Sequence, residues 1–87
     1  MVFPILHYKT PLEEKKIKYN GKFYLVNTRV EICIYRMTKE NYCSVISRDI
    51  IFNNGQCETI LLNYIHDKKT YEDVFDFTTA FMDTLTI

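Results

Sequence analysis

Apolar and polar residues alternate along much of the chain, with the period of two that is typical of strands burying one face. The clearest run is 29–37, in which Val30, Ile32 and Ile34 share one side. Large apolar residues also occur on the other side of this run, so we expect it to be a central strand of a sheet. A second apolar run, 42–52, is expected to return beside it as the next strand.

The dipeptide Asn20–Gly21 stands between two runs of strand-forming residues, 15–19 and 22–26. Asn-Gly favours the type I′ turn, because both central positions of that turn need a positive φ. A two-residue turn at this position places Ile17 opposite Tyr24. The pattern therefore predicts a β-hairpin.

The segment 56–65 follows a second turn signal, Asn54–Gly55, and its pattern fits two kinds of element. The β-branched and aromatic residues of the segment, and the turn before it, favour a strand. Its apolar residues also match helical spacing: Cys57, Ile60, Leu61, Tyr64 and Ile65. We predict a strand, with a helix as the open alternative.

The segment 70–84 predicts a helix. Thr70 is a suitable N-cap, and Asp73 stands at the capping-box position after it. Seven residues form one stripe at helical spacing: Tyr71, Val74, Phe75, Thr78, Phe81, Met82 and Leu85. We expect this aromatic stripe to pack on the sheet, and Phe77, at its margin, to be partly exposed.

Residues 1–14 contain both prolines of the chain, Pro4 and Pro11, among apolar side chains. Proline cannot donate a hydrogen bond to a strand ladder, so this segment is expected to be an extended arm or an edge strand. Its apolar side chains must be buried against the rest of the chain or against a second copy. A homodimer through the arm is therefore one alternative.

Together these elements predict an α+β fold, a four- to five-stranded antiparallel β-meander with one C-terminal α-helix packed on it. A chain of 87 residues has the size of one domain. We expect a single domain over 1–87, with the extended N-terminal arm at 1–14, the β-sheet at 15–65 and the helix at 70–84.

The two halves of the chain carry opposite charge, although the formal net charge is zero. Residues 1–48 hold nine basic and four acidic side chains, a net charge of +5. Residues 49–87 hold two basic and seven acidic side chains, a net charge of −5. This asymmetry bears on association, because opposite potentials steer different partners.

Most of the acidic residues of the second half fall on the polar side of the predicted helix, and one more precedes it. Carboxylates at these spacings can meet lysine and arginine side chains of a partner, and an aromatic residue at the edge supplies an apolar anchor. The predicted partner-binding surface consists of Asp67, Glu72, Asp73, Asp76, Phe77 and Asp83.

The basic residues of the predicted hairpin offer an alternative surface for nucleic acid. Lys15, Lys16, Lys18 and Lys22 lie among aromatic residues, and aromatic side chains on a basic sheet can stack bases. The zero net charge and the lack of an RNP-like motif argue against this alternative.

No grouping of residues in the sequence predicts catalysis. The two histidines, His7 and His66, belong to no Ser-His-Asp, Cys-His or His-Glu-x-x-His pattern, and two glycines cannot form a phosphate-binding loop. Three cysteines without a Cys-x-x-Cys pair predict reduced structural thiols rather than a disulfide framework or a zinc knuckle. We expect no enzyme activity, no metal and no cofactor.

The first residues lack the basic and apolar pattern of a secretory leader, and no apolar run is long enough to cross a membrane. We therefore expect a cytoplasmic protein without a membrane partner.

The chain resembles the small inhibitors that phages and mobile elements encode against bacterial defence, anti-CRISPR proteins above all. The resemblance lies in its size, its preference for amino acids with AT-rich codons, its lack of catalytic residues, and an acidic helix beside a small antiparallel sheet. It covers the whole chain as a type and carries over no functional residue.

This resemblance implies a non-enzymatic inhibitor in the bacterial cytoplasm. Its partner would be a bacterial nucleic-acid-binding effector, such as a Cas protein or complex, whose nucleic-acid site or activation it blocks. A dimeric structural or antitoxin-like subunit is a further alternative.

Overall fold

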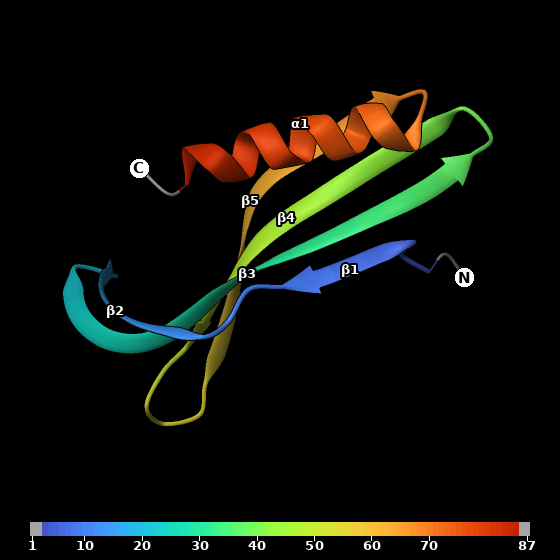
Figure 1. Ribbon diagram of the computed structural model, residues 1–87. Helices are drawn as coiled ribbons and strands as arrows, with labels where there is room; N and C mark the ends of the chain where they lie inside the picture. The colour runs from blue at the N-terminus through green and yellow to red at the C-terminus, as the bar shows by residue number, and fades with distance from the viewer. Residues whose placement is uncertain (1–2, 86–87) are drawn as a thin grey trace.

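Strand β3 (Lys22–Thr38) is the longest element of the computed structural model, which describes residues 3–85. β4 (Asn41–Ile51) pairs antiparallel with β3, and β5 (Cys57–Lys68) pairs antiparallel with β4 (Figure 1). The two expected strand segments of 22–26 and 29–37 are therefore one continuous strand.

Two shorter strands share the other edge of β3. β1 (Leu6–Lys9) pairs with the second half of β3, and β2 (Glu13–Tyr19) pairs with the first half. With helix α1 (Tyr71–Thr84), the five antiparallel strands form one open sheet and confirm the predicted α+β arrangement. The predicted extended arm contributes β1, and its last two residues already belong to β2.

A proline separates β1 from β2. The backbone N–H of Thr10 donates to the carbonyl oxygen of Val30 at 2.9 Å, and the Thr10 hydroxyl accepts the N–H of Val30 at 2.8 Å. Pro11 and Leu12 then stand opposite the single residue Arg29, because Glu13 resumes the ladder at the next position. The missing N–H of proline thus coincides with an extra residue that interrupts the ladder.

The β2–β3 turn has the predicted geometry. Asn20 and Gly21 have φ values of 50° and 81°, as a type I′ turn requires. Ile17 pairs with Tyr24, so the register expected from the two-residue turn is confirmed.

The segment after Asn54–Gly55 is a strand, which confirms the prediction and excludes the helical alternative. β5 contains two extra residues relative to β4. Leu62 falls between the pairs Ile46–Asn63 and Ser47–Leu61, and His66 and Asp67 together stand opposite Cys43. Asp67 has a φ of 59°, the left-handed conformation that such irregularities use.

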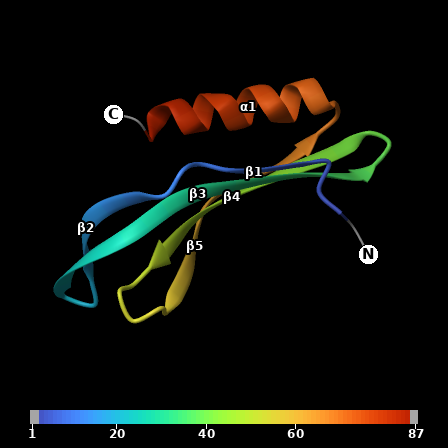
Figure 2. The ribbon, with the colours of Figure 1, turned by 60° about the horizontal axis from the view of Figure 1, so that its bottom comes forward.

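Helix α1 lies across one face of the sheet (Figure 2). It begins as predicted at the N-cap Thr70, whose hydroxyl accepts the backbone N–H of Asp73 at 3.1 Å. The core lies between the helix and the sheet and is formed by the buried residues Val30, Ile32, Ile34, Ile46 and Val74. Within residues 3–85, no helix has both the length and the apolar character needed to cross a membrane.

The predicted packing of the helical stripe is wrong for two aromatic residues. Val74 and Thr78 are buried, but the exposed fractions of Tyr71 and Phe75 are 38% and 42%. The reason is the position of α1, which packs mainly over β4 and β5 and to a lesser extent over β3. Residues on the β1 side of the helix therefore lie beside a part of the sheet that the helix does not cover, and they remain exposed.

The opposite face of the sheet carries an ion pair between the buried carboxylate of Asp49 and the partly exposed guanidinium of Arg29. The carboxylate of Asp49 accepts hydrogen bonds from Nε of Arg29 at 3.0 Å and from the Thr59 hydroxyl at 3.1 Å. Burial alone would raise the pKa of Asp49, but the hydrogen bonds of its carboxylate with Arg29, Glu31 and Thr59, together with the charge of Arg29, outweigh it and lower the pKa. Asp49 is therefore ionised at neutral pH.

Asp49→Asn is expected to lower the free energy of unfolding by about 2 kcal/mol, because a hydrogen bond to a charged group contributes about 1.5–3 kcal/mol. Glu13→Gln is the matched control, since the Lys15–Glu13 pair at 3.2 Å is exposed. The control should cost less than about 1 kcal/mol. Urea unfolding of both variants measures the difference.

The Asp49→Asn substitution should also change how the free energy of unfolding depends on pH. The lowered pKa of Asp49 stabilises the folded state at neutral pH, and this contribution is lost as pH falls from about 3.9, the ordinary aspartate value, through the folded-state pKa. The Asp49→Asn variant should lack this part of the loss. Parallel acid-unfolding profiles of the two proteins would contradict the assignment.

Candidate functional site

Four of the predicted acidic residues project from α1 and form what we call the acidic ridge. Glu72 and Asp73 occupy the first turn, Asp76 and Asp83 follow, and all four are exposed. At about 100° per residue, Glu72, Asp76 and Asp83 lie on the side of the helix opposite Val74, and Asp73 lies at the margin of the ridge. Among residues 3–85, no ion pair engages Glu72, Asp73 or Asp76.

Asp67, the fifth predicted acid, stands on β5 rather than on the helix. Its carboxylate is hydrogen-bonded to Nδ1 of His66 at 2.7 Å. The ring of His66 stacks on Tyr64, with 5.0 Å between the ring centres. Asp67 is thus engaged locally in the irregular part of β5.

Phe77 lies on one flank of the acidic ridge, and 53% of it is exposed, as predicted. The ammonium group of Lys68 sits over its ring, 3.8 Å from the centre. This cation–π contact holds an exposed aromatic side chain in one place beside the carboxylates.

Tyr71 and Phe75 lie on the other flank. Their ring centres are 5.8 Å apart, and Tyr71 also meets Tyr42 of β4 edge-on at 6.5 Å. The acidic ridge therefore has exposed aromatic residues on both sides.

A groove runs between α1 and β1, beside Tyr71 and Phe75. It has a volume of about 330 Å³, and its walls are almost entirely apolar. Its lining comes from both elements and from β3: Leu6, Tyr8, Ile32, Ile34, Phe75, Thr78, Thr79 and Met82. The groove exists because the helix packs mainly over β4 and β5 and leaves β1 and the adjoining part of β3 uncovered.

The hairpin lysines are divided between the two faces of the sheet. Lys16 and Lys18 lie on the face that the helix leaves uncovered, with ammonium groups 5.3 and 5.9 Å from the ring centre of Phe23. Lys15 projects from the other face and pairs with Glu13. Lys22 stands opposite Tyr19 beside the turn.

A second concavity of about 480 Å³ lies between the tips of the two hairpins. Three of its rings contact one another: Tyr19, Tyr24 and Phe52 are 5.4–6.5 Å apart between centres. The rest of its lining includes the polar residues Asn53, Asn54, Gln56 and Glu58. The structure thus brings aromatic and amide groups together near the predicted basic surface.

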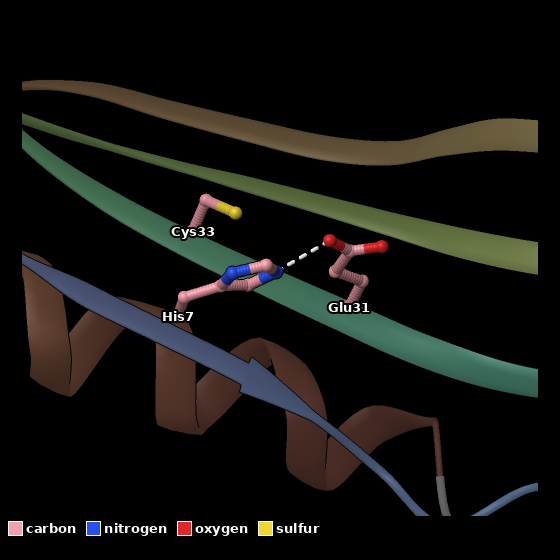
Figure 3. A group of neighbouring side chains, drawn as sticks. All are labelled: His7, Glu31 and Cys33. Atoms are coloured by element: carbon pink, nitrogen blue, oxygen red, sulfur yellow. Dashed lines mark hydrogen bonds and ion pairs between the residues drawn. The ribbon is translucent and has the colours of Figure 1, made fainter. Parts of the chain in front are cut away.

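One cluster of ligating side chains was missed by the sequence reasoning. His7, Glu31 and Cys33 come from β1 and β3, and their donor atoms lie within 4.8 Å of one another. Figure 3 shows the imidazole of His7 between the sulfur of Cys33 and the carboxylate of Glu31, to which it is hydrogen-bonded. Only the β1–β3 register, with His7 opposite Cys33, could have revealed it.

Burial raises the pKa of the Cys33 thiol, and a hydrogen bond with Tyr35 offsets only part of this effect. The nearby carboxylate of Glu31 raises this pKa further, while the ammonium of Lys9 lowers it. The thiol is therefore mostly protonated at neutral pH when no cation is bound.

The predicted arm pairs with β3 of its own chain along one edge of β1. Several of its side chains nevertheless remain exposed, among them Phe3, Ile5 and Leu12. Dimerisation through these residues stays a prediction.

Comparison with known proteins identified no relative of this chain: no family model, no curated protein and no solved structure matches it.

Proposed function

We propose that this protein is a non-enzymatic inhibitor that acts by binding, with α1 and its flanks as the contact surface. The partner is a nucleic-acid-processing protein that carries a basic groove. The observation that carries this proposal is the combination of an acidic ridge with exposed aromatic residues on both flanks and an apolar groove beside one of them.

The aromatic residues distinguish this surface from an ordinary solvated helix. A helix that only covers a core shows polar side chains to solvent, whereas Tyr71, Phe75 and Phe77 are all at least one-third exposed. Rigid aromatic side chains provide most of the binding energy in many protein interfaces. The cation–π contact of Phe77 and the ring contact of Tyr71 with Phe75 limit the rotamer freedom that would be lost on binding.

The charge of the ridge selects the partner. Glu72, Asp73 and Asp76 have no ion-pair partner among residues 3–85, so their field extends into solvent. Such a field accelerates encounter with a basic surface and disfavours acidic ones. A groove that normally holds DNA or RNA is basic, so a carboxylate row of this kind can compete with the nucleic acid for it.

The proposed mode of action is binding alone, without a chemical step. A chain of this size inhibits by occupying the basic groove or by holding the partner in one conformation, and one inhibitor molecule is needed for each partner molecule. This mode agrees with the resemblance to anti-CRISPR inhibitors, in which a bacterial nucleic-acid effector is the target.

Glu72→Lys combined with Asp76→Lys tests the ridge. These two positions are exposed and lie outside the core, so the reversal should keep the fold and weaken partner binding at least about tenfold through like-charge repulsion. Glu58→Lys combined with Glu14→Lys is the matched control, because both residues are exposed acids away from α1.

The measurement is capture from a bacterial lysate with the three immobilised proteins, followed by quantitative mass spectrometry. The proposal requires that the wild type and the control capture a nucleic-acid-binding protein and that the ridge variant does not. Added DNA or RNA should displace this protein from the wild type. Equal capture by all three proteins would exclude the ridge as the contact.

A Phe75→Ala variant tests the apolar flank independently of charge. Truncating an aromatic anchor at the centre of an interface costs about 2 kcal/mol or more, so retention of the same partner should fall roughly thirtyfold. Phe23→Ala removes an exposed ring of the hairpin and serves as the control. If Phe23→Ala loses the partner and Phe75→Ala retains it, the partner contacts the hairpin rather than the helix.

A second candidate function, direct binding of single-stranded nucleic acid, is favoured by the hairpin. Lys16 and Lys18 flank Phe23, and the concavity between the hairpin tips presents Tyr24 and Phe52 beside it. Exposed rings next to ammonium groups are the elements that sequence-independent single-strand binders use.

Fluorescence anisotropy with a labelled oligonucleotide tests this second function. Binding that weakens steeply with salt, and that Lys16→Gln with Lys18→Gln abolishes, would support it. The control is Lys39→Gln, in the turn after β3. Failure of the wild type to bind at low salt would remove this function and leave the helix proposal intact.

A further inference from the structure

We propose that His7, Glu31 and Cys33 form a binding site for Zn²⁺ that ties the amino-terminal strand β1 to the central strand β3. The site lies on the face of the sheet opposite α1 and is independent of the binding function proposed for the helix.

The sheet register places the three side chains together. His7 stands directly opposite Cys33 in the β1–β3 ladder, and residues directly opposite in antiparallel strands point to the same face. Glu31 precedes Cys33 by two positions and therefore also projects from this face. Ile32, between them, points to the other side and belongs to the core under α1.

The three donors are of the kinds that Zn²⁺ selects. Imidazole nitrogen, carboxylate oxygen and thiolate sulfur are its usual protein ligands, whereas Mg²⁺ and Ca²⁺ prefer sites made of oxygen alone. A set with one donor of each kind thus favours Zn²⁺ over the abundant hard cations. Three protein ligands leave a fourth tetrahedral position for water or for a group from another molecule.

The distances are compatible with coordination after small side-chain rotations. Zn²⁺ ligands at about 2.0–2.3 Å from the metal lie roughly 3.3–3.6 Å from one another in a tetrahedron. The donor atoms of the cluster already lie within 4.8 Å of one another. The side chain of His7 is 44% exposed, so its ring can turn without disturbing the core.

Zn²⁺ binding and proton release are coupled at Cys33, so the affinity of the site should rise with pH. Binding of Zn²⁺ releases the thiol proton of Cys33 to solvent and forms the Zn–S bond. The two negative charges of Glu31 and the Cys33 thiolate then neutralise the charge of the ion.

A bound Zn²⁺ stabilises β1. This strand is four residues long and is separated from β2 by the interruption at Pro11. A short edge strand with few ladder bonds opens easily. Zn²⁺ bridging His7 to Glu31 and Cys33 adds a link between β1 and β3, so the ion stabilises the pairing of the arm with its own chain.

Isothermal titration of the reduced, chelator-treated protein with Zn²⁺ tests the site. We expect one ion per chain, a higher unfolding temperature with Zn²⁺ than without it, and no displacement by excess Mg²⁺. The variants Cys33→Ser, His7→Gln and Glu31→Gln should each weaken binding at least about tenfold, because loss of even a supporting group at a metal site costs that much.

The chain offers a matched control for every ligand. Cys57→Ser, His66→Gln and Glu58→Gln remove the same donor types from exposed positions outside the cluster, and they should leave the affinity unchanged. Circular dichroism of the metal-free proteins verifies that each variant is folded. Cys33→Ser keeps the size of the side chain, so this variant remains informative if Glu31→Gln does not fold.

Cobalt substitution supplies a second readout that a structural role of these residues would not produce. Co²⁺ bound through a thiolate gives a sulfur-to-metal charge-transfer absorption, which should appear in the wild type and in Cys57→Ser and vanish in Cys33→Ser. No Zn²⁺ binding by the wild type, or equal weakening by Cys57→Ser and Cys33→Ser, would overturn the proposal.

Discussion

The hydrogen-bond ladder of β3 is the constraint on which the rest of the molecule depends. This one strand pairs with β1 and β2 on one edge and with β4 on the other. Its period of two sends Val30, Ile32 and Ile34 under α1 and sends Glu31 and Cys33 to the uncovered face. The helix surface and the ligating cluster therefore occupy opposite sides of the same strand, and a partner docked on α1 leaves the cluster accessible.

Local signals in the sequence predicted the parts of the fold that are determined by neighbouring residues. Asn20–Gly21 indicated the turn and its register, and Thr70 indicated the start of the helix, because both depend on backbone preferences within a few positions. The strand at 56–65 needed the turn before it to distinguish it from a helix, since its apolar spacing fits both.

Features that depend on long-range packing could not be predicted. The exposure of Tyr71 and Phe75 follows from where α1 lies across the sheet, which the period of the helix does not specify. The meeting of His7 with Cys33 follows from the register of β1 against β3, in which the paired residues are more than twenty positions apart in the sequence. Of the candidate site, the ridge could be predicted from sequence, whereas the groove and the ligating cluster required coordinates.

The irregular pairing of β5 has a consequence for behaviour at high concentration. β5 is the outermost strand of the sheet, and its outer edge would be a template for a strand of another molecule. Leu62 and the pair His66–Asp67 break the regular spacing of N–H and C=O groups along it and increase its local twist. A second chain cannot extend the ladder over the full length of this edge, so the insertions that shape β5 also protect the protein from edge-to-edge aggregation.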